Sequence, residues 1–235
     1  QQVQNRITLL RRQGRLPYGW ITDATRRGYF VDTFHSAGDF IRQMAGLYRG
    51  DLWTHSDTYV EVWCESRSIA GVIERLCREL AVSLYPAGGF SSLTLAYEAA
   101  QSINQATNQG QKPAQVIYIG DYDPAGVLID KSIDAELRQH LDASVDMQFH
   151  RLAITEQQID DYDLPTKPRK TTDRRALHIS ETVEAEAMPA GVLRDLLRWE
   201  IESYLPDGAL LVTQTAEKSE RDGLLAIAEA MTDEW

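Results

Sequence analysis

Cysteine is scarce in this chain of 235 residues, which contains only Cys64 and Cys77. The two do not form a Cys-x-x-Cys pair, and the five histidines show neither a His-x-His nor a His-Glu-x-x-His spacing. A zinc site and a disulfide framework are therefore not expected. Cys64 lies in an apolar run, which favours a buried structural thiol over a reactive one.

Long apolar runs and nucleotide-binding loops are also missing. No stretch of 18 apolar residues occurs and no signal peptide is visible, so the sequence predicts a soluble, cytoplasmic protein. The chain has neither a Walker loop nor a Gly-x-Gly-x-x-Gly motif. Carboxylates therefore remain as the candidate chemical groups.

Positive charge is in short supply, because 24 lysines and arginines face 35 aspartates and glutamates, for a net charge of -11. This balance argues against a simple nucleic-acid coat, whose surface would be basic. The charge is uneven, however: residues 1–30 contain six arginines and one aspartate, and residues 165–175 contain five basic residues. Such asymmetry indicates a basic face on an acidic body.

The most informative stretch is residues 116–126, VIYIGDYDPAG. Its apolar start predicts a buried strand, and the proline and glycine at its end predict a turn into an amphipathic helix. Because alternate residues of an extended segment point the same way, Asp121 and Asp123 can aim their carboxylates at one point. Paired carboxylates at the end of a strand suit Mg²⁺, although the spacing alone is more typical of a surface turn.

Two other stretches have a similar layout. Residues 59–65, YVEVWCE, form an apolar run that ends in Glu65, and residues 84–94, LYPAGGFSSLT, join a short strand to a helix through a glycine turn. Right-handed crossovers would place all three loops along one edge of a parallel sheet, with Glu65 beside the two aspartates. The residues expected in the loop near this site are Gly88, Gly89, Ser91 and Ser92.

The alternation of strand and helix predicts an α/β fold with a four-stranded parallel sheet and flanking helices. The expected strands are 59–64, 82–85, 115–120 and 146–152, and the helices between them are 68–81, 91–108 and 126–142. Further helices are expected at 1–13, 33–47, 156–162, 190–204 and 214–231. We expect three parts: a basic, helical, partly winged-helix-like segment (1–57), the core (58–153), and a C-terminal extension with a basic loop and two helices (154–235).

Together these motifs resemble the Toprim domain, the Mg²⁺-binding catalytic domain of topoisomerases, primases and overcoming-lysogeny-type nucleases. The pattern is most similar to the topoisomerase VI A subunit and its meiotic double-strand-break relative. The matching segments are Asp123-Pro124-Ala125-Gly126, Gly89-Phe90-Ser91, and Thr155 to Ile159 with Leu164-Pro165. The resemblance spans about residues 59–165. It implies DNA strand cleavage with Mg²⁺ or Mn²⁺ held by Asp121 and Asp123, and with Glu65 as a third ligand or general acid/base.

Three departures from the family pattern leave the reaction open. Ser66 stands where the family commonly has a lysine, and Ala87-Gly88 stands where a basic residue is common. The family's nucleophilic tyrosine precedes the Toprim part, and none of the ten tyrosines here has an evident matching setting. The attacking group could therefore be a tyrosine or water. Alternatives to a topoisomerase-like enzyme are a hydrolytic nuclease of a defence or mobile-element system and a non-catalytic DNA-binding or partner-docking module.

Basic residues outside the site are the candidates for DNA contacts. They are Arg6, Arg11 and Arg12 of the first helix and Lys167, Arg169 and Lys170 of the proline-containing loop. A solvated helix and a solvated linker are the alternatives. We expect DNA as the partner, together with a second copy of the chain or a second subunit. Glu184 and Glu186 are interpreted as solvated acids, although the family has a similar acidic stretch.

Overall fold

The computed structural model describes residues 2–17, 31–88, 93–108, 110–169, 175–176 and 178–231. The chain divides into two compact units. The larger unit is Leu47–Asp222, and the smaller unit joins Gln1–Gly46 to Gly223–Trp235. All three candidate acids lie in the larger unit.

The larger unit is built on a four-stranded sheet in the order β2-β1-β3-β4, in which every neighbouring pair is parallel. The strands are β1 (Tyr59–Cys64), β2 (Ser83–Pro86), β3 (Ala114–Ile119) and β4 (Met147–Ala153). Central strands β1 and β3 are apolar along almost their whole length because helices cover both faces of the sheet. The predicted α/β class with a parallel sheet is confirmed.

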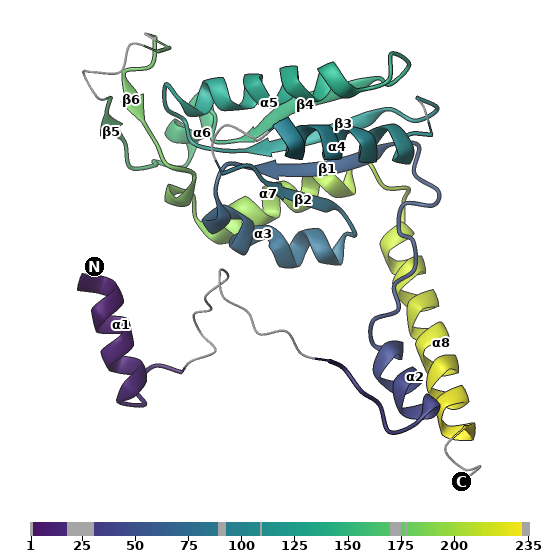
Figure 1. Cartoon of the computed structure of the whole chain (residues 1–235). Helices are drawn as coiled ribbons and strands as arrows, with labels where there is room; N and C mark the ends of the chain where they lie inside the picture. The colour runs from purple at the N-terminus through teal and green to yellow at the C-terminus, as the bar shows by residue number, and fades with distance from the viewer. Residues whose placement is uncertain are drawn as a thin grey trace. The chain divides into compact units, whose positions relative to one another are not determined.

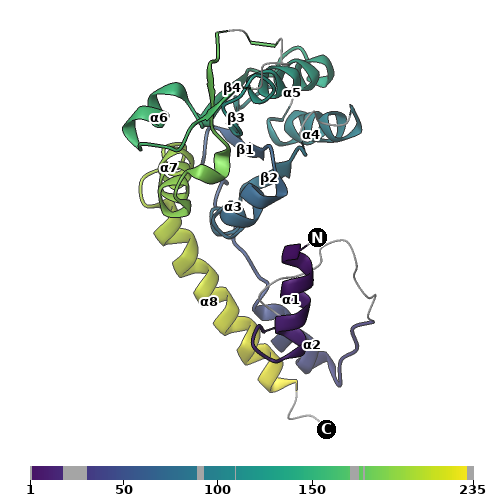
Figure 2. The ribbon, with the colours of Figure 1, turned by 90° about the vertical axis from the view of Figure 1, so that its left-hand side faces the viewer.

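Two pairs of helices sandwich this sheet (Figures 1 and 2). One face, with Trp63 and Tyr118, packs against α4 (Leu93–Ala106) and α5 (Gly126–His140). The other face, with Val62 and Ile117, packs against α3 (Arg67–Glu79) and α7 (Ala190–Glu202). Cys64 is fully buried on that second face, which confirms its structural role. The segment after β3 is therefore held by packing on both sides.

The segment after β4 contains a short helix and a small hairpin-like pairing. Thr155 and Gln158 form a capping box for α6 (Glu156–Asp161). The proline-containing segment that follows was predicted to be a loop, and this was wrong for two of its residues. Lys167–Pro168 forms β5, which pairs antiparallel with β6 (Glu181–Thr182). A two-residue edge strand tolerates the missing N–H of a proline. The 3₁₀ turn η2 (Ala185–Ala187) follows.

The smaller unit contains α1 (Gln2–Arg12), α2 (Ala37–Ala45) and the end of α8 (Ala209–Ala230). Ser36 caps α2 by accepting a hydrogen bond from the Asp39 N–H. Helix α8 starts earlier than predicted, directly after Gly208, whose positive φ of 74° ends the preceding turn. Part of the predicted winged-helix-like segment, residues 18–30, lies outside the described residues. None of the described helices combines the length and the apolar character needed to cross a bilayer.

Candidate active site

The three candidate acids lie at the carboxyl ends of adjacent strands. Glu65 follows β1 directly, and its N–H donates to the carbonyl oxygen of Ile119 in β3 at 2.9 Å. Asp121 follows β3 after one glycine, and Asp123 precedes α5. Parallel neighbouring strands end at the same edge of a sheet, so topology alone brings these residues to one edge.

Each of the three carboxylates uses one oxygen to hold backbone N–H groups. Glu65 Oε2 accepts from the N–H of Asp121 at 2.9 Å, and Asp121 Oδ1 accepts from the N–H of Ala185 at 2.8 Å. Asp123 Oδ1 accepts from the N–H groups of Ala125 and Gly126 ahead of α5. In the described part of the chain, the second oxygen of each carboxylate accepts no hydrogen bond. Those three oxygens are available to a ligand.

The electrostatics of this edge disfavour charge on Glu65 and Asp121. Burial raises the pKa of Glu65, and the neighbouring Asp121 and Asp123 raise it further, against the opposing effect of the donated N–H. Burial also raises the pKa of Asp121, and repulsion from Glu186, Asp123 and Glu184 adds to the shift. Carboxylates that are desolvated and mutually repelling gain from protonation or from a bound cation.

Glu184 and Glu186 are exposed, as predicted, but they also lie close enough to Asp121 to raise its pKa, which the sequence did not predict. Tyr122 and Val183 exchange backbone hydrogen bonds at 2.8 and 2.9 Å. This pairing places the η2 segment beside the loop that follows β3. The Ser66 hydroxyl, in the position where the family commonly has lysine, donates to Glu186 Oε1 at 2.9 Å. The family's similar acidic stretch was the only available signal, because about 60 residues separate these glutamates from Asp121.

Arg151 of β4 holds the backbone of the loop that contains Asp121 and Asp123. Its guanidinium donates to the carbonyl oxygens of Gly120, Asp121 and Gly126 at 2.9, 3.0 and 2.8 Å. It also forms an ion pair with Asp130 of α5 at 2.8 Å, and both side chains are largely buried. An arginine inside a strand gave no sequence signal for this role.

Gly126 is required by a close approach of two backbone segments. A Cβ atom at this position would collide with the carbonyl oxygen of Asp121. This contact explains the glycine of the Asp-Pro-x-Gly pattern, because the helix must begin directly against the acidic loop. Gly88 has a positive φ of 67°, whereas the predicted loop residues Gly89, Ser91 and Ser92 lie outside the described residues.

The two tyrosines nearest the acids face the apolar core. Tyr122 packs against the cluster on the α3 and α7 side, and Tyr118 is fully buried on the α4 and α5 side. The Tyr118 hydroxyl has no hydrogen-bond partner in the described part of the chain. A buried tyrosine hydroxyl normally has a partner. Gly120 lies closely against this hydroxyl, since a Cβ atom at Gly120 would collide with it.

The predicted DNA contacts fall in different parts of the structure. Arg6, Arg11 and Arg12 lie on α1 of the smaller unit, where Arg6 and Arg12 are exposed. Lys167 forms an exposed ion pair with Glu184 at 2.8 Å. Arg169 donates to the carbonyl oxygens of Ala176 and Ile179. Lys170 lies outside the described residues. The basic loop is therefore partly engaged with its own unit.

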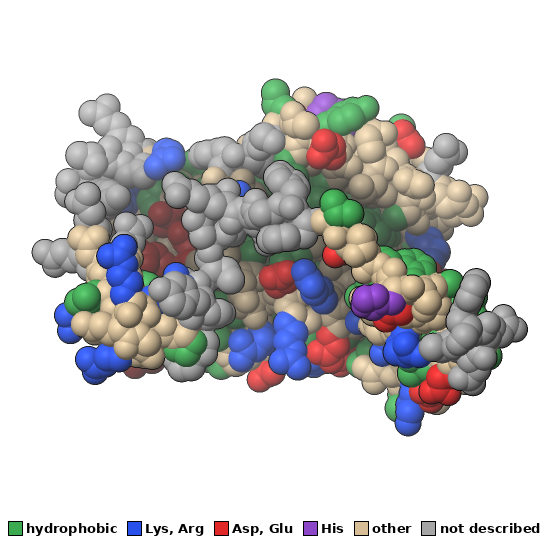
Figure 3. Space-filling model, turned by 60° about the horizontal axis from the view of Figure 1, so that its bottom comes forward, with side chains coloured by type: hydrophobic (Ala, Val, Ile, Leu, Met, Phe, Trp, Pro, Cys, Tyr) green, Lys and Arg blue, Asp and Glu red, His purple; other side chains and the backbone are tan. Residues whose placement is uncertain are grey.

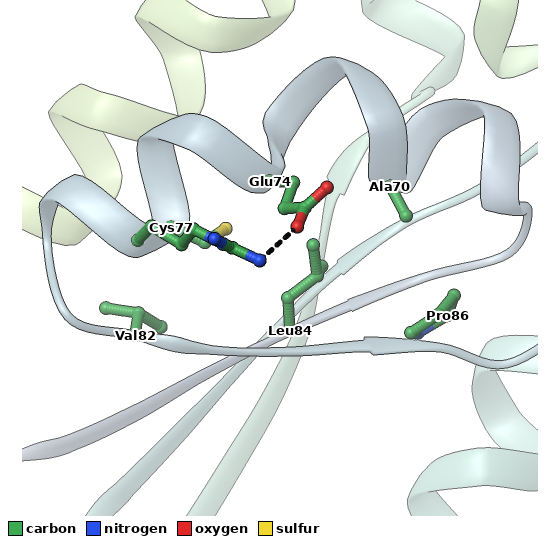
Figure 4. Close-up of a pocket in the computed structure, with 7 residues that line it drawn as sticks. Ala70, Glu74, Cys77, Val82, Leu84 and Pro86 are labelled. Carbon is green, nitrogen blue, oxygen red and sulfur yellow. Dashed lines mark ion pairs between the residues drawn. The ribbon is translucent and has the colours of Figure 1, made fainter. Parts of the chain in front are cut away.

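An apolar hollow between α3 and the edge strand β2 is separate from the acids (Figure 4). Its volume is about 390 Å³, and Ala70, Cys77, Val82 and Leu84 are among the residues that line it. Glu74 and Arg78 form an ion pair beside it at 2.7 Å. Burial raises the pKa of the Cys77 thiol to about 12. The thiol is therefore protonated at neutral pH and is a poor nucleophile.

Within the described residues, no three His, Cys, Asp or Glu side chains are gathered into a group that could hold a metal ion as it stands. No protein-family model, curated protein or solved structure matches the chain.

Proposed function

We propose that this protein cleaves the phosphodiester backbone of DNA at the acidic edge of its sheet, in the manner of a Toprim enzyme related to the topoisomerase VI A subunit. One observation carries the proposal: Glu65, Asp121 and Asp123 each hold backbone N–H groups with one oxygen and leave the other free at the same sheet edge. This arrangement orients the side chains while it keeps a donor from each available.

The donor set fits a hard divalent cation. Mg²⁺ and Mn²⁺ prefer carboxylate oxygens and keep several waters, and each of the three acids has one oxygen without a hydrogen bond in the described part of the chain. Asp121 and Asp123 would hold the ion, which leaves the free oxygen of Glu65 for proton transfer. The free oxygens would have to turn toward a shared point, because the described side chains do not form a closed metal site. The bound ion would neutralise charge on the scissile phosphate.

The protein groups then have distinct tasks. Arg151 holds the carbonyl groups of Gly120 and Asp121 and so fixes the direction of the acidic loop. Glu65 has a raised pKa, which suits a group that takes a proton from the attacking water and returns it to the leaving oxygen. In this reaction a water oxygen bonds to phosphorus while the bond from phosphorus to the leaving oxygen breaks.

Hydrolysis is the route favoured for this chain because Tyr118 and Tyr122 both face the core. The test is incubation with internally labelled supercoiled DNA and Mn²⁺ or Mg²⁺, followed by a denaturing quench and gel analysis. We expect nicked or linear DNA without attached protein, and loss of cleavage in EDTA and in Glu65→Ala and Asp121→Ala. The matched control is Glu98→Ala, which removes an exposed acid from α4.

Two results would contradict parts of this proposal. Cleavage that survives in Glu65→Ala and Asp121→Ala would place the activity elsewhere or in a contaminant. A protein-linked DNA band that is lost in a tyrosine-to-phenylalanine variant would show that a tyrosine of this chain attacks the phosphate. In that case the free 5′ or 3′ product end of hydrolysis would be replaced by a covalent phosphotyrosine bond.

A further inference from the structure

A groove between α3 and α7 contains three arginines and belongs to neither the acidic edge nor the predicted DNA contacts. Its volume is about 570 Å³. The residues that line it are Gly71, Val72, Arg75, Leu76 and Glu79 of α3 and Arg194, Asp195 and Arg198 of α7. Figure 3 shows the face that carries α3, where basic and acidic side chains are interleaved. The two helices pack together through an apolar seam beneath, so the groove has a rigid floor.

Only one of the three arginines in the groove is paired with an acid. Arg198 is neutralised by ion pairs with Glu79 at 2.9 Å and Glu202 at 3.0 Å. Arg75 and Arg194 are exposed and form no ion pair or side-chain hydrogen bond in the described part of the chain. Asp195 is the remaining acid of the lining. Unpaired guanidinium groups in a groove favour an anionic ligand, and their planar forks suit phosphate.

The α3 side of the groove continues toward the acidic edge. Arg67, Gly71 and Arg75 are spaced by four residues and are all exposed, so they share one face of α3. Arg67 is likewise without a partner among the described residues, and it follows Ser66, which contacts Glu186. Arg67 and Arg75 are about 12 Å apart along the helix axis at a rise of ~1.5 Å per residue. A few consecutive nucleotides would cover that distance.

Gly71 keeps the middle of this path open. A Cβ atom at Gly71 would meet nothing within 4 Å, so packing inside the molecule does not require a glycine there. Glycine is unfavourable in a helix interior relative to alanine. Because Gly71 has no side chain, a phosphate backbone could approach the helix closely between the two arginines.

We propose that the α3–α7 groove, with Arg67, Arg75 and Arg194, binds the phosphate backbone of a DNA strand that leads to the acidic edge. The identification of DNA rests on the proposed function, and the binding itself does not need the acids. The opposite possibility, an acidic polypeptide in the groove, lacks the link to a phosphodiester site and is an outcome of the test.

The experiment measures binding of a fluorescein-labelled DNA duplex by anisotropy in EDTA, from 50 to 200 mM KCl. We expect the double variant Arg75→Gln/Arg194→Gln to bind more weakly and to lower the slope of log affinity against log salt by about two units. The change in affinity across this salt range then shrinks about tenfold. Asp195→Asn should do the reverse and tighten binding.

The matched control is Arg78→Gln/Arg138→Gln, which removes the same charge from α3 and α5 at arginines that are already paired with Glu74 and Asp134. Thermal melts of all variants check folding. Equal slopes for the two double variants would overturn the proposal. The proposal would also be overturned if labelled poly-glutamate bound in a manner that depends on Arg75 and Arg194 while DNA binding did not depend on them.

Failure of the groove and failure of the catalytic proposal give different results. If the groove binds DNA, Glu65→Ala and Asp121→Ala should have the same slope of log affinity against log salt in EDTA as the parent protein. A retained slope with no cleavage by any form of the protein would contradict the catalytic proposal alone. Cleavage that depends on the acids, with no effect of the groove arginines on binding, would contradict the groove alone.

Discussion

Glu61 is a fully buried carboxyl group in the middle of β1. It accepts hydrogen bonds from the Tyr59 hydroxyl at 2.8 Å and from the Trp63 indole N–H at 3.1 Å. Desolvation raises its pKa from 4.5 to about 7, and the two donors only partly oppose this effect. Folding therefore favours the protonated form of this side chain.

The pH dependence of stability follows from the sign of that shift. Because the native pKa lies above the unfolded one, the stabilising proton is fully present below about pH 4.5 and is lost as pH rises toward 7. Glu61→Gln keeps the shape and does not titrate. We expect it to raise the free energy of unfolding by up to ~3 kcal/mol above pH 7 and by little near pH 4.5. Urea denaturation at both pH values checks this, with exposed Glu98→Gln as control. A pH-independent difference would contradict the assignment.

At the residue scale, the sequence predicts the groups that terminate strands better than the groups that lie within them. The positions of Glu65 and Asp121 follow from where the apolar runs end. Glu61 and Arg151 sit inside strands, and their partners come from packing between elements that no local pattern specifies. Their roles could therefore not be predicted from spacing.

At the scale of the element, the start of α5 depends on the absence of a side chain at Gly126. A methyl group there would collide with the Asp121 carbonyl oxygen, so Gly126→Ala must displace the acidic loop. We expect a loss of ~1–3 kcal/mol in unfolding free energy and a loss of any metal-dependent cleavage. Gly223→Ala in α8 is the control, since a Cβ atom there meets nothing within 4 Å; it should stabilise by ~0.5–1 kcal/mol. Equal effects of the two substitutions would rule out the collision.

Arg151 joins β4, the acidic loop and α5. Arg151→Met would leave the largely buried Asp130 unpaired and deprive the carbonyls of Gly120 and Asp121 of a donor. Removing one partner of such a pair costs ~3–5 kcal/mol. The added change Asp130→Asn should recover part of this loss, and the double variant should still lack cleavage because the loop is unsupported. Denaturation midpoints and the gel assay measure the two effects. If the double variant cleaved DNA again, Arg151 would serve only to neutralise Asp130 and would not be needed to support the acidic loop.

Most elements lie where periodicity and capping residues predicted them, and the differences have local causes. Strand β1 and α5 begin at the expected residues because an apolar run and a Pro-x-Gly turn define them. Helix α8 begins five residues earlier than expected, since its exposed Leu211 and Val212 break the amphipathic pattern used to place it. Strands β5 and β6 were missed because a proline in so short a pairing gives no strand signal.

At the scale of the whole chain, the α/β class and the parallel sheet were predictable because strands and helices alternate. The contribution of Glu184 and Glu186 to the acidic edge was not, because it depends on the pairing of Tyr122 with Val183 across about 60 residues. Long-range pairings of this kind are specified by the assembled core and not by the local sequence.

A divalent cation should stabilise the whole fold if it binds the acidic edge, because a ligand of the native state shifts the unfolding equilibrium. At ten times its Kd the gain is ~1.4 kcal/mol, which is a few degrees in Tm for a chain of this size. Asp121→Asn keeps an oxygen for the Ala185 N–H and removes the charge that Glu186, Asp123 and Glu184 repel. Its apo form should therefore melt higher than the parent at neutral pH, with the difference vanishing below the ordinary pKa of aspartate. It should also show little shift with Mg²⁺ or Mn²⁺. Two results together would exclude the metal site. The parent would have the same Tm in EDTA and in millimolar metal, and the apo form of Asp121→Asn would have the same Tm as the apo parent.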